Sequence, residues 1–181
     1  MRFSETELQG VWIIDIEPHT DSRGLFARTF CAEEFRARGL PNIFCQASTS
    51  WNAVRGTLRG MHYQKAPSQE AKLVRCTRGE LYDVVLDLRI ESPTFGRSVG
   101  FELSEDSRRS IMIPHGCAHG FVTLTDATEV LYMMSEPHAP HLARGVRWND
   151  PHFSISWPLV PVVISERDAS YADFVRERGE G

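Results

Sequence analysis

Short apolar runs recur along this chain about every ten residues, and Gly, Pro, Asn or Asp separates each run from the next, a spacing typical of β-strands joined by turns. The strands that this pattern predicts cover residues 11–16, 25–30, 72–77, 81–88, 100–103, 110–113, 120–124 and 129–135. Helix signals are few. Residues 33–39 favour a helix that Gly39 and Pro41 terminate. The charged stretch after Ser165 favours a short helix before a loose Gly-Glu-Gly end. Many short strands with little helix predict an all-β sandwich or barrel and not a βαβ fold.

The middle of the chain predicts a hairpin. Residues 72–77 and 81–88 have the composition of strands, and Arg78-Gly79-Glu80 between them suits a tight turn. Within the second strand, Asp83 and Asp87 share a parity, so both carboxylates should face one side of the sheet. If that side is the interior, Asp83 needs a partner such as His119 or His62, because an unpaired buried carboxylate is very costly.

The size and charge of the chain exclude several classes of protein. Its 181 residues fit one domain, residues 1–181, with a sizeable core. A formal charge of −4 without a basic run argues against a nucleic-acid partner. No apolar stretch reaches the roughly 18 residues that span a membrane, and no apolar signal core begins the chain. The four cysteines lie far apart with no CxxC pair, so we expect a soluble protein of the reducing cytoplasm.

The passage from Gly56 to Gln64, with Lys72 shortly after it, carries the strongest indication of an enzyme. It places Arg59, His62 and Lys72 in two short β-like runs. An imidazole that can be neutral at pH 7 can take a proton from a carbon beside a carbonyl, and neighbouring cations can stabilise the negative charge that results.

Other features allow both a structural and a functional interpretation. His119 could simply bond the backbone of a turn, although it precedes a strand in a sandwich that already offers His62, which favours a site. Tyr132 could be an ordinary strand aromatic, or a phenol that points into an apolar interior as a general acid. Residues 144–151 have turn chemistry with one packing Trp, and residues 165–168 are a charged surface stretch by composition.

A metal site is the main alternative chemistry. The candidate ligands are three histidines and one of two glutamates, namely His62, His115, His119, and Glu70 or Glu80. Metal-binding barrels of the cupin type usually carry a His-x-His pair, and here Gln64 stands at its second position. Lys72 would also repel a cation. We therefore expect no metal and no other cofactor.

Taken together, these passages resemble the dTDP-4-dehydrorhamnose 3,5-epimerase family. Matches in the right order run over nearly the whole chain, so the resemblance is highly specific to the family and less specific to one substrate. The motifs that carry it are Asp21-Ser-Arg23-Gly24, Gly56-Thr-Leu-Arg59-Gly60-Met-His62-Tyr-Gln64, Lys72-Leu-Val-Arg75, Arg78-Gly-Glu-Leu-Tyr-Asp83, Asp87-Leu-Arg89, Ser92-Pro-Thr-Phe-Gly96, Ile113-Pro-His-Gly-Cys-Ala-His119-Gly120, Leu131-Tyr132, Arg144-Gly-Val-Arg-Trp148-Asn-Asp-Pro151 and Ser165-Glu-Arg-Asp168.

The resemblance implies a metal-free, cupin-type jelly-roll barrel with a few short helices. It also implies a homodimer whose N-terminal strands are exchanged across the interface. The implied substrate is a nucleotide-diphosphate 4-keto-6-deoxy sugar, epimerised at C3 and/or C5 through an enolate in deoxysugar and cell-surface polysaccharide biosynthesis.

The resemblance further implies a role for individual residues. His62 would be the general base, oriented by Asp168, and Tyr132 would reprotonate the carbon from the opposite face. Lys72 and His119 would bind near the sugar, with Lys72 placed to stabilise the enolate. The remaining substrate-binding residues are Arg23, Arg59 and Arg167 at the nucleotide or its diphosphate, together with Phe26, Gln46, Asp83 and His138.

Three positions depart from the family pattern, all on the nucleotide side. Arg28 stands where the family commonly has Glu, His138 where it commonly has an aromatic on the thymine, and Ala143 where it has a further acid. We therefore expect the chemistry to be retained while the base or sugar recognised differs. Alternatives are an epimerase of one centre only or of another nucleotide sugar, a non-catalytic sugar-nucleotide-binding barrel, and a metal-dependent cupin.

Overall fold

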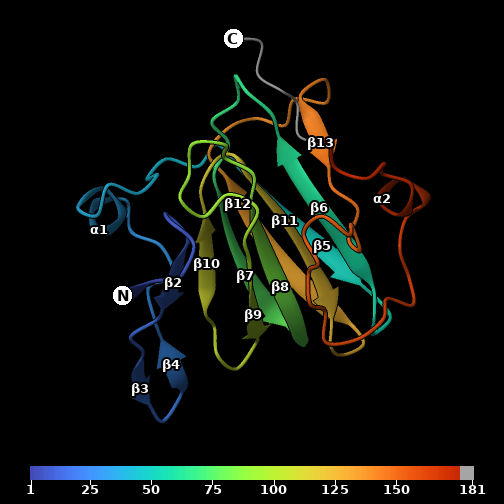
Figure 1. Ribbon diagram of the computed structural model, residues 1–181. Helices are drawn as coiled ribbons and strands as arrows, with labels where there is room; N and C mark the ends of the chain where they lie inside the picture. Colours follow the sequence, from blue (N-terminus) through green and yellow to red (C-terminus); the bar gives the residue numbers. More distant parts are fainter. Residues whose placement is uncertain (176–181) are drawn as a thin grey trace.

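The computed structural model describes residues 1–175 and consists of two large β-sheets with two short helices (Figure 1). The strands are β1 (Arg2–Glu5), β2 (Trp12–Asp15), β3 (His19–Asp21), β4 (Gly24–Phe26), β5 (Gln46–Asn52), β6 (Leu58–Gln64), β7 (Lys72–Arg78), β8 (Glu80–Asp87), β9 (Ser98–Ser104), β10 (Ser110–Ile113), β11 (Cys117–Thr123), β12 (Thr128–Met134) and β13 (Ala143–Gly145). The helices are α1 (Ala32–Arg36) and α2 (Glu166–Ala169).

The two large sheets form the barrel. One has six strands in the order β1-β2-β10-β7-β12-β5, and the other has five in the order β13-β6-β11-β8-β9. Neighbouring strands within each sheet are antiparallel. Strands β3 and β4 pair only with each other and form a hairpin that projects from the rest of the molecule (Figure 1). The expected all-β, cupin-type jelly roll with few helices is confirmed.

The hydrophobic core lies between the sheets and extends over their outer faces. The central cluster joins Val74 and Cys76 of β7 to Leu81 and Val85 of β8. A second cluster covers the outer face of the six-stranded sheet, where Phe35 of α1 is fully buried. Strand β10 is therefore buried at every residue, since both of its faces are covered.

The predicted hairpin of residues 72–88 is wrong. Strand β7 pairs with β10 and β12 in the six-stranded sheet, whereas β8 pairs with β11 and β9 in the other. The chain crosses from one sheet to the other at Gly79, which has a φ of +72°. Two apolar strands joined by a short turn can pair directly or face each other across a core, and here burial of both inner faces decides the outcome.

Two other expected elements differ in their limits. The strand expected over residues 25–30 ends at Phe26, and Phe30 instead packs against the rings of Phe35 and Phe44. The helix expected over residues 33–39 is confirmed as α1, which ends at Arg36 before a turn. The short helix expected after Ser165 is α2, while the Gly-Glu-Gly end lies outside the described residues.

Asp83 and Asp87 both face the interior, as their shared parity predicts, and both are fully buried. The carboxylate of Asp87 accepts bonds from Arg89 Nε and Nη2 at 2.8 Å each, from Ser92 Oγ at 2.5 Å and from Thr94 Oγ1 at 2.6 Å. Burial by itself raises the pKa of Asp87, but these hydrogen bonds outweigh it and lower the pKa to about 2.

We expect Asp87→Asn to lower the free energy of unfolding by about 3 to 5 kcal/mol at pH 7, because Arg89 would then be left without its buried counter-charge. A carboxylate whose pKa is lowered by folding stabilises the protein above its ordinary pKa of 3.8 and loses that effect as the pH falls toward 2. Urea unfolding at pH 7 and pH 3 checks both points. Equal stability of the variant and the wild type at pH 7 would contradict the prediction.

Within residues 1–175, no helix is long and apolar enough to cross a membrane.

Candidate active site

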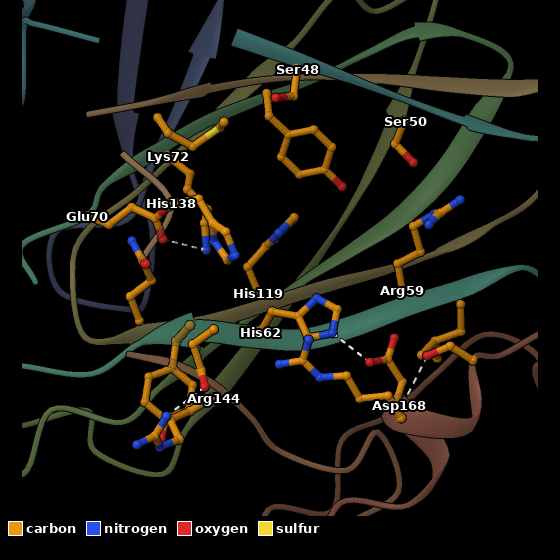
Figure 2. Close-up of a pocket in the computed structure, with 18 of the residues that line it drawn as sticks. Ser48, Ser50, Arg59, His62, Glu70, Lys72, His119, His138, Arg144 and Asp168 are labelled. Carbon is orange, nitrogen blue, oxygen red and sulfur yellow. Dashed lines mark hydrogen bonds and ion pairs between the residues drawn. The ribbon is translucent and has the colours of Figure 1, made fainter. Parts of the chain in front are cut away.

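A pocket of about 790 Å³ lies between the two large sheets, and both sheets contribute to its wall. Strands β5, β7 and β12 line it from the six-stranded sheet, and β6, β11 and β13 line it from the five-stranded sheet. Residues 163–168, which lead into α2, close one side. Figure 2 shows the polar side chains that converge here from these strands.

His62 of β6 forms a pair with Asp168 of α2. The imidazole Nε2 lies 2.7 Å from Asp168 Oδ1, and the side chains are 44% and 6% exposed respectively. Burial raises the pKa of Asp168, but hydrogen bonds from His62 and from the Gly60 amide outweigh it, so the pKa lies below its ordinary value. An ionised carboxylate can only accept hydrogen bonds, so in the neutral form of the imidazole Nε2 carries the hydrogen and Nδ1 keeps a lone pair.

The pairing of these residues is a long-range feature, since they are 106 positions apart. The amide of Leu58, at the start of β6, donates to the carbonyl of Val163 at 2.8 Å, which lays residues 163–168 beside that strand. Ser165 then begins α2 and accepts a hydrogen bond from the amide of Asp168 at 3.1 Å. The reading of residues 165–168 as a surface stretch is therefore wrong for Asp168, which is buried.

Tyr132 lies on the opposite wall, on β12. Val130, Tyr132 and Met134 share the inner face of this strand, because alternate residues point to the same side. Val130 packs in the core, whereas Tyr132 and Met134 line the pocket. Burial raises the pKa of Tyr132 well above 10, and the nearby charge of Asp83 raises it further. The phenol therefore keeps its proton at neutral pH, as a general acid requires.

His119 of β11 stands beside Tyr132, with their rings edge to face at a centroid separation of 5.9 Å. Its Nε2 lies 2.7 Å from Asp83 Oδ2, and both residues are almost completely buried. Asp83 thus obtains the histidine partner that its burial requires. Its other oxygen, Oδ1, has no hydrogen-bond partner among the described residues.

Lys72 and Arg59 contribute positive charge to the pocket. The Nζ of Lys72 lies 3.2 Å from Glu70 Oε2, and only 15% and 6% of these side chains are exposed. Arg59 donates through Nε to Asn52 Oδ1 at 2.7 Å, which fixes the direction of its guanidinium. Figure 2 shows Glu70 and Lys72 together, on the side of the pocket away from Arg59. Both cations are held by neighbours before any ligand arrives.

A sequence model of the dTDP-4-dehydrorhamnose 3,5-epimerase family matches residues 5–175. The chain belongs to this family. A relative from Methanothermobacter thermautotrophicus, a dTDP-4-dehydrorhamnose 3,5-epimerase, is 44% identical, and the match covers 94% of this chain and 92% of that protein. The resemblance that the sequence motifs indicated is thereby confirmed, and with it the expectation that the chain is an isomerase.

Solved structures of the family superpose closely on this fold. A dTDP-4-dehydrorhamnose 3,5-epimerase from Bacillus anthracis with TDP and PPi bound has a TM-score of 0.92 at 34% identity, covering 96% of this chain and 99% of that one. A 3'-monoepimerase from Streptomyces bikiniensis in complex with dTDP-quinovose has a TM-score of 0.86 at 32% identity, covering 93% and 85%.

The structure places most of the residues singled out from the epimerase motifs on this one pocket. The predicted site residues that line it are His62, Lys72, Tyr132, Asp168, Gln46, Arg59, His119, His138 and Arg167. Asp83 lies behind His119. Gln46 also accepts the backbone hydrogen bond of His138 at 2.9 Å, and Gln64 accepts that of Ala139 at 2.6 Å, so two amide side chains fasten the segment that carries His138.

Arg23 and Phe26 are not brought to this pocket. They belong to the projecting hairpin of β3 and β4, where the side chain of Arg23 is 88% exposed and Phe26 is 78% exposed. Arg23 instead bonds Asp21, two residues before it. Arg28, which departs from the family pattern, lies 3.2 Å from Glu34 and is also remote from the pocket of its own chain.

Sequence reasoning missed several residues of the epimerase pocket. Arg144, assigned to turn chemistry, lies in β13 and lines the pocket. Glu70, considered only as a metal ligand, also lines it. Ser48 and Ser50 also line it, and their alternation with Gln46 along residues 46–50 was a usable signal for one face of a strand. Arg144 begins one of the family motifs, but no local signal placed it in the pocket, because its position depends on the pairing of β13 with β6.

The residues considered for a metal site do not gather. No group of three or more His, Cys, Asp or Glu side chains within residues 1–175 is arranged to hold an ion. His62 and His119 are each committed to a carboxylate, while His115 is exposed and does not line the pocket.

Proposed function

We propose that this protein is an epimerase that inverts C3 and/or C5 of a nucleotide-linked 4-keto-6-deoxyhexose, of the dTDP-4-dehydro-6-deoxyglucose to dTDP-4-dehydrorhamnose type. One observation carries the proposal. The base candidate His62 and the acid candidate Tyr132 line one pocket from different sheets, β6 in the five-stranded sheet and β12 in the six-stranded sheet. A base and an acid on opposite walls can remove a proton from one face of a carbon and return another to the opposite face, which inverts that carbon.

The geometry supports a short proton path. Nδ1 of His62 takes the proton beside the ketone, and the electron pair of that C–H bond moves to the C4 oxygen to form an enolate. The ammonium of Lys72 stabilises the enolate oxygen, because charge that develops in a water-poor site gains most from donors already in place. Tyr132 then gives its hydroxyl proton to the carbon. The imidazolium and the phenolate return to their starting forms by proton exchange with solvent.

Three guanidinium groups of the pocket suit the diphosphate and nucleotide. Figure 2 shows Arg59 on the side of Asp168 and Arg144 on the side of Lys72. Arg167 precedes Asp168 in α2 and lines the same pocket. The planar fork of an arginine can hold two phosphate oxygens at once. The relatives solved with TDP and PPi or with dTDP-quinovose support a nucleotide sugar as ligand.

The first experiment is NMR of dTDP-4-keto-6-deoxyglucose with the wild-type protein in D2O, following the C3 and C5 protons. Deuterium at both carbons with an inverted product supports a 3,5-epimerase. Deuterium at one carbon supports a single-centre enzyme. One of the solved relatives is described as such an enzyme, a 3'-monoepimerase. If nucleotide sugars bind but none of those tested exchanges deuterium, the result would contradict the proposal and favour a non-catalytic barrel.

We further propose that the nucleotide side of the site differs from that of an ordinary member. His138 and Ala143 both line the pocket, where the family commonly has an aromatic and an acid. A histidine offers less stacking surface, and an alanine offers no hydrogen-bond acceptor. The KM for the dTDP sugar should therefore exceed the low-micromolar range, and a low-micromolar KM would contradict this specificity hypothesis.

We propose a homodimer of cytoplasmic location in which the N-terminal strands are exchanged. The support is the projecting hairpin of β3 and β4, whose Arg23 and Phe26 are exposed and lack a pocket on their own chain. The four cysteines of residues 1–175 are all free, and only Cys45 among them is exposed, which fits a reducing compartment. Sedimentation at micromolar concentration should give twice the mass of 20.5 kDa, and Arg23→Ala should raise the KM. A monomer with full activity would contradict the exchange.

A further inference from the structure

We propose that Tyr171 is a positioning residue for His62, acting on the imidazole from outside the pocket. This inference rests on the proposed function of the site. Tyr171 follows α2, three positions after Asp168, and it is not one of the pocket-lining residues. One short segment therefore supplies both the carboxylate that bonds His62 and an aromatic ring beside it.

The ring of Tyr171 meets the imidazole of His62 edge to face. Their centroids are 6.4 Å apart and their planes are inclined at 73°, within the range in which aromatic pairs attract each other. A single hydrogen bond, from Nε2 to Asp168, leaves an imidazole free to rock about the bond. A ring contact from a second direction restricts that motion and keeps Nδ1 aimed at one point.

Gly145 makes room for this contact. It pairs with His62 in the ladder of β13 and β6, and a Cβ at Gly145 would lie 2.1 Å from Cε2 and Cζ of Tyr171. The phenol ring thus occupies the space over the residue next to His62, and any side chain at position 145 would displace it. The guanidinium of Arg167 lies 6.0 Å from the centre of the same ring, so Tyr171 adjoins a second pocket residue.

The hydroxyl of Tyr171 is not what holds the ring in place. It is buried and has no hydrogen-bond partner among the described residues, a condition that costs free energy. The backbone is anchored instead, because Arg147 Nη1 donates to the carbonyl of Tyr171 at 3.3 Å. The ring itself carries the proposed role, so phenylalanine should replace tyrosine and alanine should not.

The test compares two ways of removing the ring with a matched control in the same sheet. Tyr171→Ala deletes it, and Gly145→Ala pushes it away. Both should lower kcat for deuterium exchange by about tenfold and change KM by less than about twofold, since small misplacements of a reacting group cost rate more than binding. Tyr171→Phe should retain most of the rate. Loss of rate in Tyr171→Phe equal to that in Tyr171→Ala would overturn the role of the ring.

The control is the contact between Tyr82 and Gly100 on β8 and β9. A Cβ at Gly100 would lie 2.0 Å from Tyr82 Oη, and neither residue lines the pocket. Gly100→Ala and Tyr82→Ala should lower the melting temperature as much as the Gly145 and Tyr171 variants do, while kcat stays within about twofold of the wild type. An equal fall of kcat in both sets would mean that general destabilisation is responsible, which overturns the inference.

A second readout separates this inference from the proposed function. Relaxation of the His62 ring nitrogens in 15N NMR reports how freely the imidazole moves, without any turnover. In the wild type and in Gly100→Ala this motion should be restricted. In Tyr171→Ala, which keeps the bond to Asp168, the ring should move over a wider range. Unchanged relaxation of His62 in Tyr171→Ala would overturn the inference even if the wild type exchanges deuterium, and absent exchange in the wild type would contradict only the proposed function.

Discussion

Substitution of His62 by alanine should remove deuterium exchange and epimerisation together, with kcat falling by about 10³-fold or more. The imidazole that is placed to take the proton beside the ketone would then be gone. Of the two other histidines that line the pocket, His119 is committed to Asp83 at 2.7 Å, and Figure 2 shows His138 on the side of Lys72, away from Asp168. The measurement is NMR in D2O at enzyme concentrations high enough to detect residual turnover. Exchange that persists in His62→Ala would show that another group is the base.

The partner variant Asp168→Asn tests why His62 is effective. Asparagine keeps the size of the side chain but removes the charge that stabilises the imidazolium formed after proton transfer. We expect a fall in kcat on the order of 10²-fold with the fold intact by circular dichroism. A variant with wild-type kcat would mean that the bond of 2.7 Å to Asp168 serves structure alone.

Tyr132→Phe should separate the two halves of the reaction. Deuterium exchange needs only the base to remove and return a proton, so exchange should continue at a reduced rate. Inversion needs a donor on the opposite wall, so formation of the epimer should fall about 10²-fold or more. Following both signals in one NMR time course gives the ratio directly. Equal loss of exchange and inversion would show that Tyr132 mainly orients the substrate.

The ionisation of Tyr132 gives the same assignment a pH test. Burial raises the pKa of this phenol above its ordinary value of 10.0, so the protonated, donating form persists beyond the pH at which an exposed tyrosine loses its proton. The inversion rate of the wild type should therefore show no decline through phenol ionisation up to pH 10. A falling limb below pH 9 that is absent from Tyr132→Phe would contradict the raised pKa.

Local sequence patterns predicted the strands well and their partners less well. The apolar alternation and turn residues placed β7 and β8 within one or two residues of their limits. The same residues did not reveal that the two strands belong to opposite sheets. A turn such as Arg78-Gly79-Glu80 serves either arrangement, and only the burial of both inner faces against each other distinguishes them.

The candidate site divides in a similar way. His62, Lys72 and Tyr132 could be named from residue type and motif, because proton abstraction beside a ketone requires a base, an acid and a cation. The sequence offered Glu70 only as a metal ligand and Arg144 only as part of a turn motif, because their contacts in the site depend on neighbours that the fold supplies. Arg23 and Phe26 remain predictions that rest on the proposed dimer.

The sequence by itself determined the all-β class, the family and the candidates for the base and the acid, because these depend on residue type, short-range periodicity and motifs. The tertiary structure decided which side chains meet. It brings Asp168 to His62 across 106 positions, sets Tyr132 on the facing sheet and lays the ring of Tyr171 over Gly145. Those contacts follow from how the strands share one buried core, and burial of that kind is a property of the whole chain, which no local pattern of residues contains.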